Sequence, residues 1–78
     1  MTGEQLMEAN NIMHELKDVE AKMEIIADMQ EGHHAVKLYN SEIGSVQLTL
    51  EVADEVCGIV LNSLIHKAEE LRKEFQEL

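Results

Sequence analysis

The chain has 78 residues, 45% of them hydrophobic, and its sixteen acidic against six basic side chains give a formal net charge of −10. This excess of acid argues against binding to duplex nucleic acid or to an anionic membrane, because both interactions depend on lysine and arginine. The length suits one hydrophobic core, so we expect a single domain over residues 1–78.

A long helix is expected over residues 2–31. Thr2 and Gln5 have the spacing of a capping box, in which a hydroxyl and an amide satisfy two free N–H groups at the start of a helix. We expect Gly32 to end this helix in the left-handed conformation. Between these ends, apolar residues recur every three or four positions as a heptad seam; they are Ala9, Ile12, Leu16, Val19, Met23 and Ile26.

A β-hairpin is expected over residues 33–50, where apolar and polar residues alternate on both sides of the turn formers at 40–44. The apolar residues should form one face that packs on the helices; they are Val36, Leu38, Val46, Leu48 and Leu50. The polar residues should face outward or toward another protomer; they are His33, Lys37, Tyr39, Ser45, Gln47 and Thr49.

A second helix is expected over residues 51–78, starting either at a hydroxyl cap from Thr49 or at acidic residues set against the positive end of the helix dipole. Residues 50–65 are apolar on more than one side, which predicts burial against several neighbours, whereas 67–78 has the narrow stripe of an exposed amphipathic helix. The predicted fold is therefore mainly α with a small β-hairpin (α+β), with two long helices joined by the hairpin.

The apolar first half of the second helix predicts a helical homo-oligomer. Two antiparallel helices bury one stripe each, so that pairing leaves further apolar residues in water unless another chain covers them. The predicted interface residues are Val52, Val56, Ile59 and Leu61. Gly58 is consistent with close approach of a helix or ligand, and a merely tolerated glycine explains it equally well.

Metal binding and catalysis are not expected. The four histidines are His14, His33, His34 and His66, and they form no HExxH pair, while Cys57 has no CxxC partner. Cys57 should be a small buried hydrophobe, and no nucleophile, base and orienting group assemble in the pattern. We therefore expect a non-enzymatic protein without metal or cofactor. With no leader pattern and no apolar stretch of about 18 residues, we expect it in the cytoplasm.

The polar residues of the hairpin include the side-chain types that recognise a small anionic or nucleotide ligand. Lys37 can pair with phosphate and Tyr39 can stack on a base, while hydroxyl and amide groups can bind ribose or base edges. The predicted ligand-binding residues are His33, His34, Lys37, Tyr39, Ser45, Gln47, Thr49 and Asn62. The alternative interpretation of these residues is a solvent-exposed polar sheet face with a helix–helix amide contact.

The order of elements, a long acidic helix, the hairpin HHAVKLYNSEIGSVQLTL and a second long helix, resembles that of many short bacteriophage and prophage proteins. Some of those proteins counter bacterial immunity, either as oligomers that cage nucleotide immune signals between protomers or as acidic proteins that occupy a host enzyme's nucleic-acid site. The order also resembles a prefoldin subunit in miniature.

The resemblance implies three possible functions. The leading hypothesis is a homo-oligomer in the cytoplasm of a bacterial host that sequesters a small nucleotide immune signal without chemistry. The first alternative is an acidic inhibitor that binds a host defence protein or mimics nucleic acid. The second alternative is a coiled-coil assembly or chaperone-like factor whose activity resides in its helices.

Overall fold

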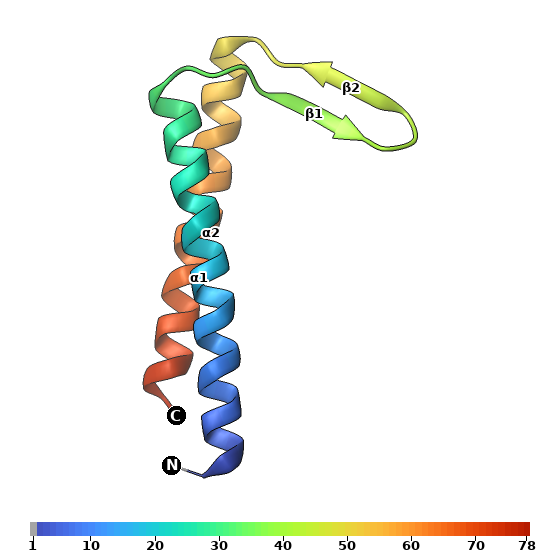
Figure 1. Cartoon of the computed structure of the whole chain (residues 1–78). Coiled ribbons are helices and arrows are strands. Elements are labelled where there is room, and N and C mark those ends of the chain that lie inside the picture. Colours follow the sequence, from blue (N-terminus) through green and yellow to red (C-terminus); the bar gives the residue numbers. More distant parts are fainter. Residues whose placement is uncertain (1) are drawn as a thin grey trace.

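The computed structural model, which describes residues 2–78, contains two long antiparallel helices joined by a β-hairpin (Figure 1). The elements in chain order are α1 (Gly3–Glu31), β1 (Lys37–Asn40), β2 (Gly44–Gln47) and α2 (Leu50–Gln76). The predicted fold class, two long helices joined by a hairpin, is confirmed. The ends of α1 and α2 that lie farthest from the hairpin are close together.

Hydroxyl caps start both helices at the predicted positions. The Gln5 backbone N–H donates to the Thr2 hydroxyl at 3.1 Å, and the Thr2 N–H donates to the Gln5 side-chain oxygen at 3.0 Å, which completes the capping box. The Val52 N–H donates to the Thr49 hydroxyl at 3.3 Å. Of the two starts considered for α2, the hydroxyl cap is therefore present, and Glu51 adds an acidic side chain to the first turn.

The end of α1 differs from the prediction. Gly32 has φ −84° and stays right-handed, while His33, with φ 51°, takes the left-handed conformation. The expectation of a left-handed Gly32 was wrong. A glycine at this position is explained instead by the space beside it. A Cβ atom at position 32 would lie 2.6 Å from Nε2 of His34, so the absence of a side chain leaves room for that ring.

The buried core lies along the predicted seam of α1 and the second half of α2. Leu16 and Val19 pack with Ala68 and Leu71, and Leu71 is 1% exposed. The partly buried side chains around this cluster are Ile12, Met23 and Leu64. The stretch expected to be an ordinary exposed amphipathic helix therefore supplies half of the core cluster.

In the single chain only one side of residues 50–65 is buried, as expected from one antiparallel pairing, and their burial against several neighbours stays a prediction. Ala53 and Cys57 are buried against α1, as predicted for Cys57, but Val52 is 42% and Ile59 is 70% exposed. The physical reason is that one neighbouring helix covers only one side of α2, whatever the composition of its other sides.

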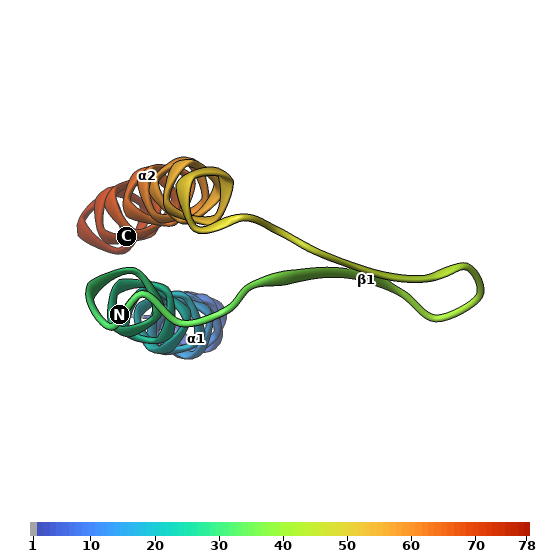
Figure 2. The ribbon, with the colours of Figure 1, turned by 90° about the horizontal axis from the view of Figure 1, so that it is seen from above.

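The hairpin stands away from both helices, and residues 37–47 are called the arm below (Figure 2). Every residue of both strands is exposed, including Leu38 at 58% and Val46 at 64%. The prediction that the apolar face packs on the helices was therefore wrong. The Leu48 N–H donates to the Val36 carbonyl at 2.9 Å. The two segments of the hairpin are therefore already paired where they leave the helices, and they project outward together.

Neither α1 nor α2 combines the length and the apolar content that crossing a bilayer requires.

Leu71→Ala should lower the free energy of unfolding by roughly 2–5 kcal/mol, because it removes a large, fully buried side chain from a small core. Thermal melts followed by circular dichroism at fixed protein concentration measure the change. Met7→Ala is the matched control, since Met7 is 67% exposed on α1, and its melt should stay close to that of the parent. Equal melts for the two variants would show that the seam is packed differently.

Candidate functional site

The arm brings four of the predicted ligand-binding residues onto one face. Lys37 lies opposite Gln47, and Tyr39 lies opposite Ser45, in the antiparallel register of β1 and β2. Directly opposed residues on neighbouring strands share a face, so these four form the polar face of the arm. Tyr39 is 76% exposed, and Lys37 is the only lysine or arginine between Lys22 and Lys67.

The opposite face of the arm is apolar. Leu38 lies opposite Val46 in the register, and both side chains are mostly in contact with solvent. Because no described residue of either helix covers this pair, the arm offers a free apolar face to a partner. Its two faces therefore have different chemistry, with an amine, a phenol, a hydroxyl and an amide on one side and aliphatic groups on the other.

The tip of the arm presents an apolar residue that the sequence analysis missed. The Asn40 side-chain oxygen accepts hydrogen bonds from the backbone N–H groups of Glu42 and Ile43, each at 2.9 Å. Gly44, with φ +125°, completes the turn in a conformation that other residues rarely adopt. Ile43 is 90% exposed at this tip. Its signal in the sequence was an aliphatic residue placed among turn formers.

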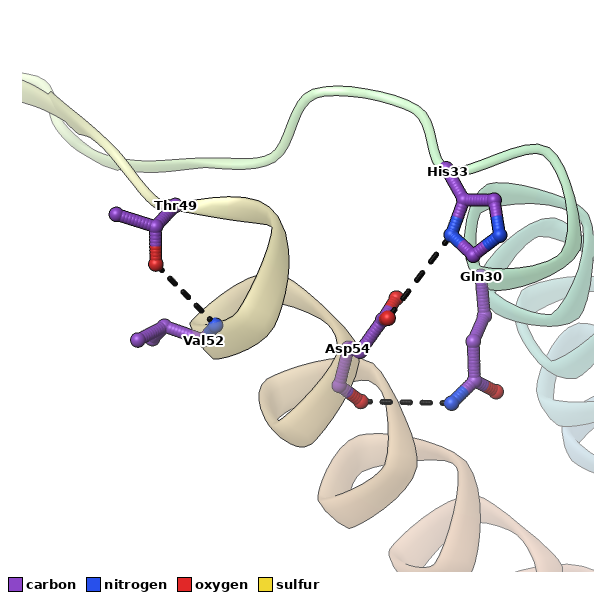
Figure 3. Close-up of polar contacts among 5 residues, drawn as sticks. All are labelled: Gln30, His33, Thr49, Val52 and Asp54. Atoms are coloured by element: carbon purple, nitrogen blue, oxygen red, sulfur yellow. Dashed lines mark hydrogen bonds and ion pairs between the residues drawn. The ribbon is translucent and has the colours of Figure 1, made fainter.

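A small polar cluster joins the two helices at the base of the arm (Figure 3). Nδ1 of His33 lies 3.9 Å from a carboxylate oxygen of Asp54, and the Gln30 side-chain N–H donates to the Asp54 carbonyl at 3.4 Å. Gln30 and Asp54 were also missed, because nothing in a local pattern shows that residues 24 positions apart meet. A Cβ atom at Gly58 would lie 3.9 Å from the Gln30 amide nitrogen, which is an ordinary contact.

The other predicted ligand-binding residues do not join the polar face. His33 lies in the turn after α1 and faces Asp54, and the ring of His34 lies beside Gly32. The Thr49 hydroxyl caps α2. Asn62 is exposed on α2, about 18 Å along the helix axis from Leu50 at roughly 1.5 Å per residue. The predicted site therefore reduces to the four residues of the arm.

Three of the four predicted interface residues share one side of α2. Val52, Val56 and Ile59 are four and three positions apart, which places them along one face of a helix, and we call them the α2 stripe. Val52 and Ile59 are exposed and Val56 is half-buried. Leu61 is half-buried and lies two positions beyond Ile59, on a different side of the helix, so it does not extend the stripe.

The rest of residues 2–78 offers weaker candidates for a site. A surface hollow at the end of the helices far from the arm is lined by Glu8, Asn11, Ile12, Glu74, Glu77 and Leu78, and its three carboxylates disfavour an anionic ligand. No three histidine, cysteine or acidic side chains of the described residues are grouped as metal ligands would be. The arm therefore remains the candidate site.

Comparisons with protein-family models, curated proteins and solved structures find no match for this chain.

The turn at the base of the arm requires a positive φ at residue 33. His33→Gly should keep or slightly raise stability, because glycine adopts positive φ without strain, whereas His33→Val should cost roughly 1–2 kcal/mol or more. Chemical denaturation of the two variants measures the difference, and His34→Val serves as the control. A His33→Val protein as stable as His33→Gly would show that residue 33 does not hold the left-handed conformation.

Proposed function

We propose that the chain is a non-enzymatic, homo-oligomeric binding protein that assembles through its arm. The observation that carries this proposal is that the arm stands off both helices with all residues of its strands exposed. An isolated two-stranded hairpin is marginally stable in water and gains stability from more strands or from packing against a helix. A partner that covers the arm supplies the packing that α1 and α2 of the same chain do not provide.

The shape of the protomer supports assembly. Its radius of gyration is 16.3 Å, whereas a compact domain of this length has about 11.5 Å. Its accessible surface is 6135 Å², whereas a folded monomer of 8.8 kDa exposes about 4,800 Å². The excess of about 1,300 Å² is larger than the surface of about 800 Å² that each partner buries in a standard interface. The protomer therefore exposes enough surface beyond that of a compact monomer to form an interface with a second copy.

The setting of the polar side chains supports binding rather than chemistry. Enzymes stabilise charge in sites that exclude water, where fixed donors act in a low dielectric. Lys37, Tyr39, Ser45 and Gln47 are all exposed on a two-stranded arm. Contact with a partner suits such residues, because the partner itself removes the surrounding water.

Replacement of residues 37–47 by an Asn-Gly turn tests the proposal. Val36 and Leu48 are already joined by a backbone hydrogen bond, so a two-residue turn can connect them, and the arm makes no packing contact with α1 or α2 that would be lost. The shortened chain should keep the helical circular dichroism spectrum of the parent. Sedimentation velocity at micromolar concentration should show that the parent is an oligomer and the shortened chain is not.

Lys37→Ala is the control for this experiment, because it changes the polar face and leaves the apolar face of the arm intact. It should sediment as the parent does. A parent protein that sediments as a folded monomer, or a shortened chain that still forms the parental oligomer, contradicts assembly through the arm.

A second candidate function is favoured by the polar face of the arm. Lys37 has no carboxylate partner among residues 2–78, as is also true of Lys17, Arg72 and Lys73, and it differs from these by its place beside Tyr39 on one face of the arm. A free cation beside Tyr39 suits a small anionic ligand with an aromatic base. In this proposal copies of the arm bind a nucleotide immune signal in the cytoplasm of a bacterial host, and the protein acts in phage counter-defence by sequestration.

Calorimetric titration with a panel of mono-, di- and cyclic nucleotides tests the second candidate. Lys37→Ala or Tyr39→Ala, each confirmed folded, should weaken binding by roughly ten- to a hundredfold, as expected for one lost charge-assisted hydrogen bond or stacking contact. Glu69→Lys with Glu70→Lys is the control and should leave nucleotide binding unchanged. The acidic inhibitor replaces this candidate if no nucleotide binds and that charge reversal abolishes binding to a basic host protein.

A further inference from the structure

We infer that each arm packs its Leu38–Val46 face onto the α2 stripe of a second copy, a contact that rests on the proposed function of assembly through the arm. Two apolar surfaces of the protomer lack a partner within the described chain. One is the Leu38–Val46 pair, with 58% and 64% of these side chains exposed, and the other is the α2 stripe. The exchange of arms between two copies covers both surfaces with one contact.

The strands of the arm are long enough to follow the α2 stripe. The α2 stripe runs from Val52 to Ile59, which is about 10 Å along the helix axis at roughly 1.5 Å per residue. Each strand of the arm has four residues and spans about 13 Å at roughly 3.3 Å per residue. One arm can therefore lie along the full length of the stripe.

Packing of the arm on a helix covers both exposed apolar surfaces, whereas pairing between two arms does not. Two arms joined edge to edge make a four-stranded sheet, but its apolar face stays in water and the α2 stripe is left uncovered. Packing against a helix is one of the two ways in which a hairpin becomes stable. Since neither helix of the same chain covers the Leu38–Val46 face, the helix must come from another molecule.

The distribution of charge favours the arm and α2 as the surfaces through which two copies meet. The chain carries −10, so most of its surfaces repel each other when two copies approach. The arm is an exception, because its only charged residues are Lys37 and Glu42, and residues 56–65 of α2 contain no acidic or basic side chain. The acidic residues of this part of α2 are Glu51, Asp54 and Glu55, all near the Val52 end of the stripe, so its Ile59 end approaches a second copy with the least repulsion.

The symmetry of the contact also suits two copies. A surface that contains both an arm and a stripe is self-complementary, so a two-fold axis repeats the arm-to-stripe contact twice and closes the assembly. Each protomer then contributes and receives one arm. The excess of about 1,300 Å² in accessible surface leaves room for an interface of standard size.

Disulfide trapping between two tagged populations tests the inference. Both carry Cys57→Ala, which removes the native thiol; one adds Val46→Cys on the arm and the other adds Ile59→Cys on the stripe. A disulfide forms only when Cβ atoms come within about 4.5 Å, so mild oxidation reports direct proximity. We expect the mixture to give a disulfide-linked heterodimer as its main product, and either population alone to give little linked dimer. Ile59→Asp should raise the dissociation constant of the parent dimer more than tenfold.

Each alternative contact between two copies gives a different disulfide-linked product. Self-linkage of the Val46→Cys population indicates that arms stack on each other, and self-linkage of the Ile59→Cys population indicates that α2 packs on α2; either result without the heterodimer overturns the inference. Absence of any link in a protein that sediments as an oligomer overturns it as well. In these cases assembly through the arm is judged separately, by the sedimentation of the chain without its arm, so the two proposals can fail independently.

Discussion

The pairing of α1 with α2 is the interaction on which the rest of the structure depends. It is built largely from small residues, since Ala9, Ala53, Cys57 and Ala68 are among the buried side chains and Leu71 is the large one that is fully buried. Small residues let two helices approach closely, but they remove little apolar area from water. Proteins of this size with so thin a core commonly gain stability from a disulfide, a metal or oligomerisation.

A single pair of helices imposes a geometric limit on burial. Each helix covers one side of the other, so a segment that is apolar on two sides keeps one of them exposed. This limit explains why each half of α2 buries two side chains, Ala53 and Cys57 in one and Ala68 and Leu71 in the other, while Ile59 is 70% exposed. Composition alone does not show which of these side chains are buried, because burial depends on what lies opposite a side chain.

The features that could be predicted from the sequence are local or periodic. The Thr2–Gln5 box and the Thr49 cap involve residues three positions apart, and the seam of α1 repeats at helical spacing. The alternation of the hairpin also predicted correctly which residues share a face, so Lys37, Tyr39, Ser45 and Gln47 were grouped as the register has them.

What could not be predicted depends on a few backbone angles and on distant contacts. The direction of the arm follows from the turn after α1, where the left-handed residue is His33 rather than the glycine before it. Alternation shows which residues share a face but not what covers that face, so the Leu38–Val46 pair was placed on helices that it does not touch. The contact of His33 with Asp54 exists only because the helices are antiparallel.

The charge of the chain has a physical role in the proposed assembly. A protein that exposes Leu38, Ile43, Val46 and Ile59 risks association in many orientations, because hydrophobic attraction has no direction. Sixteen acidic side chains on a protomer of this size make most of those orientations repulsive, and they leave the arm and the uncharged run of α2 as the surfaces that approach at low cost. Repulsion between the acidic surfaces then selects the contact as much as attraction between the arm and the α2 stripe does. Proteins commonly obtain specificity from non-directional forces in this way.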